Sequence, residues 1–224
     1  MKHLICLLFV FFCVFPVYAE NQLNQNTVNH VTNIPVRYQK NLSELTRYII
    51  KPYRNDYDKA RAIAYYIASH MVYDEYQYNE KGRTKVKYRR QTPQEFLKTR
   101  VGICADFADL FTAMCKLSGI SAGTLEGYTL KGNEILTTSK KKNEGHAWNY
   151  FMYRGKKVYV DTTYMSQGTT GHERLVTEWN RKMAINKIQR ENRFTSKTHA
   201  IEPFYFNFTY DQEKKAKSTK RIER

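Results

Sequence analysis

The spacing of apolar residues changes once along the chain, at Gly119, and this change restricts the fold class. Before Gly119 apolar residues recur at helical intervals, most clearly in Asp56–Met71 and Cys104–Ser118. From Thr124 onward the pattern becomes that of short strands separated by turn residues. A run of helices followed by a run of strands indicates an α+β domain, in which helices pack on an antiparallel sheet.

Turn and capping residues divide the helical half of the chain into separate elements. We expect a short helix over Leu42–Ile50, which Pro52 stops, and a longer one over Asp56–Met71, which Asn55 or Asp56 caps. The stretch Thr92-Pro93-Gln94-Glu95 is a capping box with proline at the first helical position, and it predicts a short helix through Leu97.

Residues 1–19 have the composition of a signal peptide. Lys2 provides a positive start, Leu4–Phe15 is an uncharged apolar run, and Val17-Tyr18-Ala19 provides a small-x-small cleavage context. The sixteen residues Leu4–Ala19 are fewer than the ~20 that a membrane-spanning helix needs, which favours a cleaved signal over an anchor. We therefore expect an exported protein, periplasmic or secreted.

The rest of the chain is then divided into an arm, a domain and a tail. Polar residues 20–40 are expected to form a loose N-terminal arm, 41–210 the folded domain, and 211–224 a basic tail. Within the domain, Glu173–Arg190 predicts a basic amphipathic helix and Phe204–Tyr210 an aromatic strand.

The 224-residue chain is strongly basic, with a net charge of +16. Such an excess suggests nucleic acid, an anionic membrane or an acidic polymer as partner, and export argues against nucleic acid. Lys85, Lys87 and Arg89 belong to a basic segment, Lys81–Arg90, whose charges alternate and share one side if the segment is extended. Either they bind an anionic envelope component or substrate, or they form a solvated loop; peripheral membrane contact also stays open.

Cleavage after Ala19 leaves two cysteines, Cys104 and Cys115. They lie eleven residues apart in one expected helix, which separates their Cα atoms by roughly 16 Å, too far for a disulfide. We interpret Cys115 as a buried apolar residue. Cys104 opens the helix, and the unpaired N–H groups of a helix start favour the nucleophilic thiolate.

Two strands expected over His146–Tyr153 and Lys157–Thr162 form a hairpin around Arg154-Gly155. If the loop contains two residues, Trp148 lies opposite Asp161, and His146 is the diagonal neighbour of Asp161 on the same face. A loop with an odd number of residues would put the imidazole and the carboxylate on opposite faces. The hairpin therefore predicts a His146–Asp161 pair, on the condition that the turn is even.

Three segments converge on one chemistry. Val101–Phe107 carries a cysteine at a helix start, Gly145–Asn149 a histidine on a strand, and Val160–Tyr164 an aspartate at the next strand. A cysteine thiolate attacks an acyl carbon, a histidine transfers the proton to the leaving group, and a carboxylate orients the imidazole. These residues predict acyl transfer through a thioester.

These segments resemble the transglutaminase-like superfamily over roughly Asp56–Gly168, about half of the chain. The shared features also include Val72-Tyr73-Asp74, Thr92-Pro93, Gly119-Ile120, Gly127-Tyr128, and the blocks His146-Ala147-Trp148-Asn149 and Asp161-Thr162-Thr163-Tyr164. The branch most similar contains the cytokinesis and kyphoscoliosis-type domains and their bacterial relatives. The resemblance implies a papain-like core with Cys104 as nucleophile, His146 as base and Asp161 as the orienting residue.

The oxyanion hole is the part of the site where this resemblance is weakest. Papain-like enzymes have a glutamine shortly before the cysteine, where this chain has Lys98. The backbone N–H of Cys104 is one expected donor, and the Tyr73 hydroxyl is a candidate for the second. Trp148 is a candidate for substrate contact or for packing, and Asn149 is expected on the opposite sheet face. The chain shows no metal cluster or nucleotide-binding loop, so we expect no cofactor.

The sequence leads to one preferred function and two alternatives. The preferred one is an exported cysteine peptidase or amidase that acts on a protein or peptide through a Cys104 thioester. If a lysine amine replaces water as the acceptor, the same site makes a cross-linking transamidase. The third hypothesis is a non-catalytic binding domain on the same scaffold, although all three expected triad residues are present.

Overall fold

The computed structural model describes residues 23–74, 89–129, 144–166, 182, 201, 203–206 and 222–223. Among these residues no helix combines the length and the apolar content that a membrane crossing requires. The expected signal peptide (1–19), residues 81–88 of the basic segment, and the helix expected over 173–190, residue 182 excepted, lie outside the described residues.

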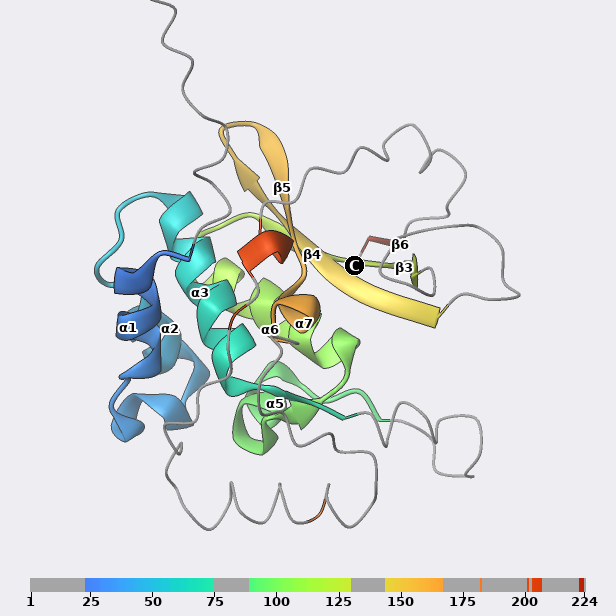
Figure 1. Cartoon of the computed structure of the whole chain (residues 1–224), viewed down its shortest axis with the longest axis horizontal. Coiled ribbons are helices and arrows are strands. Elements are labelled where there is room, and N and C mark those ends of the chain that lie inside the picture. Colours follow the sequence, from blue (N-terminus) through green and yellow to red (C-terminus); the bar gives the residue numbers. More distant parts are fainter. Residues whose placement is uncertain are drawn as a thin grey trace, which may run out of the picture.

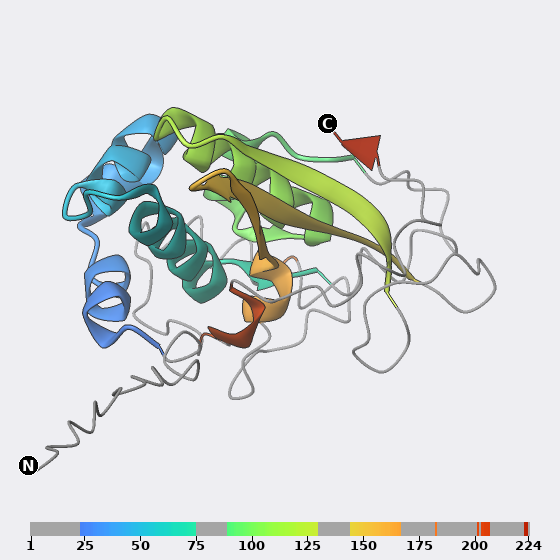
Figure 2. The same ribbon diagram turned by 90° about the horizontal axis from the view of Figure 1, so that it is seen from above.

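Helices on one side and an antiparallel sheet on the other form the α+β, papain-like core expected from the sequence (Figures 1 and 2). The helices of the first half are α1 (Gln25–Thr32), η2 (Val36–Lys40), α2 (Leu42–Ile50), α3 (Asp56–His70), α5 (Pro93–Thr99) and α6 (Cys104–Leu117). The main sheet contains β3 (Ala122–Thr129), β4 (Glu144–Tyr153), β5 (Lys156–Val160) and β6 (Ile222–Glu223), in the order β5-β4-β3-β6. A separate parallel pair joins β1 (Val72–Tyr73) to β2 (Val101–Gly102).

Side-chain caps begin the first helices where the sequence predicts them. Asn41 accepts a hydrogen bond from the Glu44 N–H at the start of α2, and Asn55 does the same for Asp58 at the start of α3. Thr92 and Glu95 close the capping box that begins α5. The helix predictions over 42–50 and 56–71, and the capping-box start at Thr92, are therefore confirmed.

Helix α6 lies between the other helices and the sheet, so it forms the centre of the core (Figure 2). It contacts β3 and β4 on one side and α3 on the other. Phe107, Leu110, Phe111 and Met114 are fully buried along its length. Burying this stripe fixes the rotation of the helix about its axis, and with it the direction in which its first residue points.

A two-residue turn joins β4 to β5, as the parity argument requires. Tyr153 pairs with Lys156, which leaves only Arg154 and Gly155 in the loop, with φ angles of 49° and 76°. Two consecutive positive φ angles are the requirement of a type I′ hairpin turn, and glycine meets it without strain at the second position. The register continues to Asn149 opposite Val160, which puts His146 and Asp161 on the same face.

Three local expectations are wrong. The N-terminal segment contains a regular helix, α1, whose Val31 side chain is buried against the core, so it is not a loose arm. Strand β5 ends at Val160 rather than Thr162, because Asp161 caps a short helix, α7 (Thr162–Met165). At the start of the segment expected as an aromatic strand, residues 204 and 205 belong to a 3-10 helix, η3 (Pro203–Tyr205), and Phe206 makes an isolated bridge to Val160; residues 207–210 of that segment lie outside the described residues.

The C-terminal tail is also more ordered at one point than expected. Residues 222–223 form β6, which pairs with Leu125 and Glu126 of β3 at the edge of the sheet. The remaining tail residues, 211–221 and 224, lie outside the described part of the chain.

Candidate active site

Cys104 is the first residue of α6 and is 6% exposed. Its side chain packs with Ala108 and Ala147 in a small cluster, and Tyr73 of β1 packs against the same cluster. Cys104 and Cys115 are both free thiols, as their separation in one helix predicts. Complete burial raises the pKa of Cys115 well above the ordinary value, with a smaller contribution from Asp56, so that thiol is held in its unreactive form.

His146 and Asp161 meet across the hairpin. The His146 Nε2 atom lies 2.6 Å from the Asp161 Oδ2 atom, and the two side chains are 7% and 0% exposed. The other carboxylate oxygen, Oδ1, accepts a hydrogen bond of 3.0 Å from the Tyr164 N–H at the start of α7. Because both oxygens of Asp161 have donors, its carboxylate is held in one orientation and holds the imidazole in turn.

The His146 ring also contacts Cys104. The Cys104 side chain is one of the groups that raise the pKa of the imidazole. Because Nε2 is engaged with Asp161, Nδ1 is the ring nitrogen left for the thiol. Trp148 and Tyr164 lie beside the imidazole, with ring centroids 6.0 Å and 4.8 Å away. The three residues selected from the sequence are therefore brought together in the order cysteine, histidine, aspartate.

Electrostatics in this site favour a charged imidazole. Burial by itself lowers the pKa of His146, but the Asp161 carboxylate and the Cys104 sulfur outweigh it and raise the pKa of His146 to about 10. At neutral pH the ring is then an imidazolium. A histidine beside a cysteine is the arrangement that nucleophilic catalysis by a thiol uses.

The raised pKa of His146 predicts a pH-dependent stability. Its folded value of about 10 lies above the ordinary 6.5, so the stabilisation is complete below pH 6.5 and is lost as the pH rises toward 10. We expect the loss in unfolding free energy caused by His146→Gln to shrink across this window, by at most about 1.4 kcal/mol per pH unit. Urea unfolding at pH 6, 8 and 10 measures it. Val31→Ala, a core change without a titrating group, is the control. If the loss in unfolding free energy for His146→Gln is as independent of pH as the loss for Val31→Ala, the prediction is contradicted.

Among the other candidates, two lie close to the triad. Tyr73 packs against the Cys104 cluster, so its hydroxyl remains the oxyanion candidate. Trp148 is 5% exposed and packs on Leu125 as well as beside His146, which leaves little of its indole for substrate. Asn149 lies on the side of the sheet that faces α6, where its amide donates to the Ala108 carbonyl at 2.9 Å. This agrees with the expectation that Asn149 and His146 lie on opposite faces of the strand.

The basic candidates are only partly described. Lys85 and Lys87 lie outside the described residues. Arg89 is exposed and forms an ion pair with Glu95, the acidic member of the capping box. Among the described residues, no group of three or more histidine, cysteine or acidic side chains is arranged to hold a metal ion.

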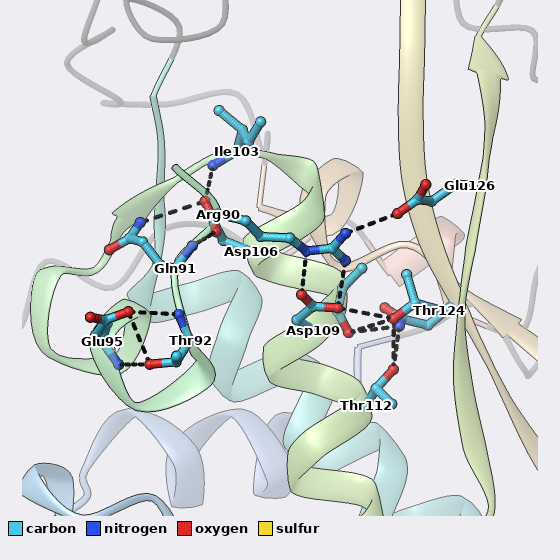
Figure 3. Close-up of polar contacts among 12 residues, drawn as sticks. Arg90, Gln91, Thr92, Glu95, Ile103, Asp106, Asp109, Thr112, Thr124 and Glu126 are labelled. Atoms are coloured by element: carbon cyan, nitrogen blue, oxygen red, sulfur yellow. Dashed lines mark hydrogen bonds and ion pairs between the residues drawn. The ribbon is translucent and has the colours of Figure 1, made fainter. Parts of the chain in front are cut away.

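The sequence reading missed Asp106, which holds the start of α6 (Figure 3). Its Oδ2 atom accepts the Ile103 N–H at 2.9 Å, and its Oδ1 atom accepts the Gln91 N–H at 3.0 Å. A Cβ on Gly102 would lie 2.5 Å from Asp106 Oδ2, so only glycine allows the carboxylate to come this close. An acidic residue at the third position of the helix was the available signal.

Comparisons with known proteins place the chain in one family. The family described as Transglutaminase-like superfamily matches residues 43–162. The kyphoscoliosis peptidases of Mus musculus and Homo sapiens are 32% and 33% identical to the chain over 132 residues, 58% of this chain and 19% of each relative. The chain thus spans about a fifth of the length of these curated relatives.

One solved structure that aligns with the chain is the periplasmic domain of TgpA from Pseudomonas aeruginosa bound to ethylmercury. It aligns with a TM-score of 0.40 and 20% identity, over 65% of this chain and 51% of that chain.

A cysteine at a helix start that faces a histidine–aspartate pair on an antiparallel sheet is the arrangement of a cysteine enzyme with a papain-like core. The family match covers more than half of the chain. The chain belongs to the transglutaminase-like superfamily.

Proposed function

We propose that this protein is an exported cysteine peptidase or amidase that hydrolyses protein or peptide substrates through a thioester at Cys104. The observation that supports it most is the 2.6 Å hydrogen bond between His146 and Asp161, together with the free, buried Cys104 thiol at the start of α6. Export rests on the composition of residues 1–19.

The first half of the reaction forms the thioester. The Cys104 sulfur attacks the acyl carbon, and the carbonyl electron pair moves to the oxygen. That oxyanion is stabilised by the backbone N–H of Cys104 at the start of α6 and by the Tyr73 hydroxyl as the candidate for the second donor. His146 then gives its proton to the leaving amine as the C–N bond breaks.

The second half of the reaction releases the acyl group. His146, now neutral, removes a proton from water, the hydroxide equivalent attacks the thioester carbon, and the C–S bond breaks. The imidazolium and the thiolate are restored, so no group is consumed. A lysine amine in place of water would leave an isopeptide bond instead. We favour water, since the similar kyphoscoliosis proteins are named peptidases.

Mass spectrometry of a cell-envelope extract incubated with the protein tests the function. New peptide termini would identify proteolysis, deamidated glutamines an amidase, and isopeptide cross-links a transamidase. The same incubation with Cys104→Ala assigns each change to the site. If wild type and variant leave the extract equally unchanged across a wide range of extracts, the binding-domain alternative replaces the proposal.

Thiol labelling gives a test that needs no substrate. As the nucleophile of the proposed reaction, Cys104 is expected to react with iodoacetamide at about pH 5.5, where an ordinary thiol with a pKa near 8.5 is inert. Peptide mapping measures the extent of labelling at each cysteine. The fully buried Cys115 is the internal control and is expected to stay unmodified. Equal resistance of both thiols at this pH contradicts an activated nucleophile.

A further inference from the structure

The side chain of Arg90 joins the helix that carries Cys104 to the sheet that carries His146 (Figure 3). Its Nε and Nη2 atoms donate to the two oxygens of Asp109 at 2.5 Å and 2.6 Å, a bidentate ion pair. Its Nη1 atom donates to Glu126 Oε1 at 2.9 Å. We call these three residues, Arg90, Asp109 and Glu126, the helix–sheet clamp.

The two ends of the clamp lie on α6, which carries Cys104, and on β3, the neighbour of the strand that carries His146. Asp109 is five residues after Cys104 on α6. Glu126 of β3 pairs with Ala147 of β4, the residue that follows His146 and packs in the Cys104 cluster. The clamp therefore fixes the position of the nucleophile-bearing helix relative to the base-bearing strand, close to where the two must meet.

The backbone beside Arg90 is held to the start of α6 as well. The Gln91 N–H donates to Asp106 Oδ1 at 3.0 Å, and the Gln91 side chain donates to the Val101 carbonyl at 2.9 Å. Asp106 in turn accepts the Ile103 N–H, immediately before Cys104. Arg90 thus extends from a backbone that is already fixed, so little freedom is lost when its guanidinium bridges the two carboxylates.

Between α6 and the main sheet, the apolar packing near Cys104 involves small side chains. The cluster around Cys104 contains only small buried side chains, Ala108 and Ala147, with Tyr73 and Ala105 packed against it. Phe107 packs on Phe96 and Tyr73, which lie outside the main sheet. The aromatic contact of α6 with the main sheet lies further along, where Phe111 meets Phe151 at 6.5 Å between ring centroids. Small side chains give little dispersion energy, so the ion pairs contribute a larger share of the helix–sheet contact near the site.

The chemistry of the clamp suits a rigid link. The three side chains are 25–29% exposed, which limits screening by solvent and salt. Burial alone would lower the pKa of Arg90, but Asp109 and Glu126 raise it above its ordinary value, so the guanidinium stays charged. Its planar fork matches a carboxylate in two parallel hydrogen bonds and therefore sets direction as well as distance.

We propose that Arg90 is a positioning residue of the reaction: by bridging Asp109 and Glu126 it holds the Cys104 sulfur at the distance from His146 that proton transfer needs. This inference rests on the proposed acyl-transfer function. Arg90 touches neither the sulfur nor the imidazole in any described contact, and it acts through the helix and the strand.

The test uses Arg90→Met and Glu126→Ala, which cut the bridge at its centre and at its sheet end. Arg61→Met is the matched control, because Arg61 also forms a half-buried ion pair with an aspartate, Asp58, at the start of α3. NMR titration of the His146 ring is the first measurement and needs no substrate. The second measurement is kcat and KM on the substrate identified by mass spectrometry.

We expect both clamp variants to lower the pKa of His146 toward the value in Cys104→Ala, because contact with the sulfur is one of the interactions that raise it. We expect kcat to fall by about 10- to 100-fold with KM nearly unchanged, as for a small displacement of reacting groups. Arg90→Lys keeps the charge but not the planar guanidinium, so it should recover part of the His146 pKa and part of kcat. Arg61→Met should match the wild type in titration and turnover.

If folded Glu126→Ala has the same His146 titration and the same kcat as the wild type, the positioning role is overturned, whether or not Arg90→Met folds. A shift of the His146 titration in the clamp variants, together with equal turnover by wild type and Cys104→Ala, rejects the proposed function but supports the geometric role of the clamp. The two proposals can therefore fail separately.

Discussion

Cys104→Ala is expected to remove acyl transfer almost completely, with a fall in kcat of roughly 10³- to 10⁶-fold. The covalent step has no substitute once the sulfur is gone, and only substrate binding and the oxyanion donors remain. The fold should survive, because the change removes a single sulfur atom from a cluster of small side chains, Ala108 and Ala147. Steady-state kinetics on the cleaved peptide measure the effect.

Cys115→Ala is the matched control. It removes the other buried free thiol of the same helix, at the end remote from His146, so the turnover should stay within a few-fold of the wild type. Substantial turnover by Cys104→Ala, or loss of turnover in a folded Cys115→Ala, would show that the reaction does not proceed through the Cys104 thioester.

Asp161→Asn is expected to lower kcat by roughly 10²- to 10⁴-fold, although the change removes only a charge and one acceptor. Asp161 uses both oxygens, one for His146 Nε2 and one for the Tyr164 N–H. An asparagine has a single oxygen, so it can cap α7 or accept from the imidazole, but not both. With the amide turned toward Nε2, the ring would carry its proton on the wrong nitrogen for the thiol.

The same variant changes the titration of His146. The Asp161 carboxylate is the largest of the interactions that raise the pKa of His146, so its loss leaves burial to dominate and the pKa falls. NMR titration and a kcat–pH profile measure the two effects. Asp58→Asn, which removes a carboxylate paired with Arg61 on α3, should change neither. An unaltered His146 titration in Asp161→Asn would remove the orienting role from the aspartate.

Elements with strong local signals were predictable. Caps at Asn55 and Thr92 set the starts of α3 and α5, because a side chain within three residues satisfies the first helical N–H groups. The Arg154-Gly155 turn predicted that His146 and Asp161 share a face, since strand side chains alternate strictly. Family features added the roles of these residues, which periodicity cannot supply.

Elements with weak local signals were missed. The α1 helix has few apolar residues, and only its packing on α3 makes it favourable. Strand β5 ends where Asp161 caps α7 and forms its hydrogen bond with His146, and these interactions are favoured over a continued strand. Where such an element ends is decided by contacts between distant parts of the chain, and a local sequence pattern does not contain them.

The sequence by itself determined that Cys104 begins a helix and that His146 and Asp161 share a sheet face, because capping, turn length and side-chain alternation act over a few residues. Only the tertiary structure decided that the helix and the sheet approach closely enough for sulfur and imidazole to meet. That approach depends on Arg90 reaching Asp109 and Glu126, 19 and 36 residues away, and on the burial of α6 against β4. Contacts over such separations follow from how whole elements pack, and packing is a property of the folded chain.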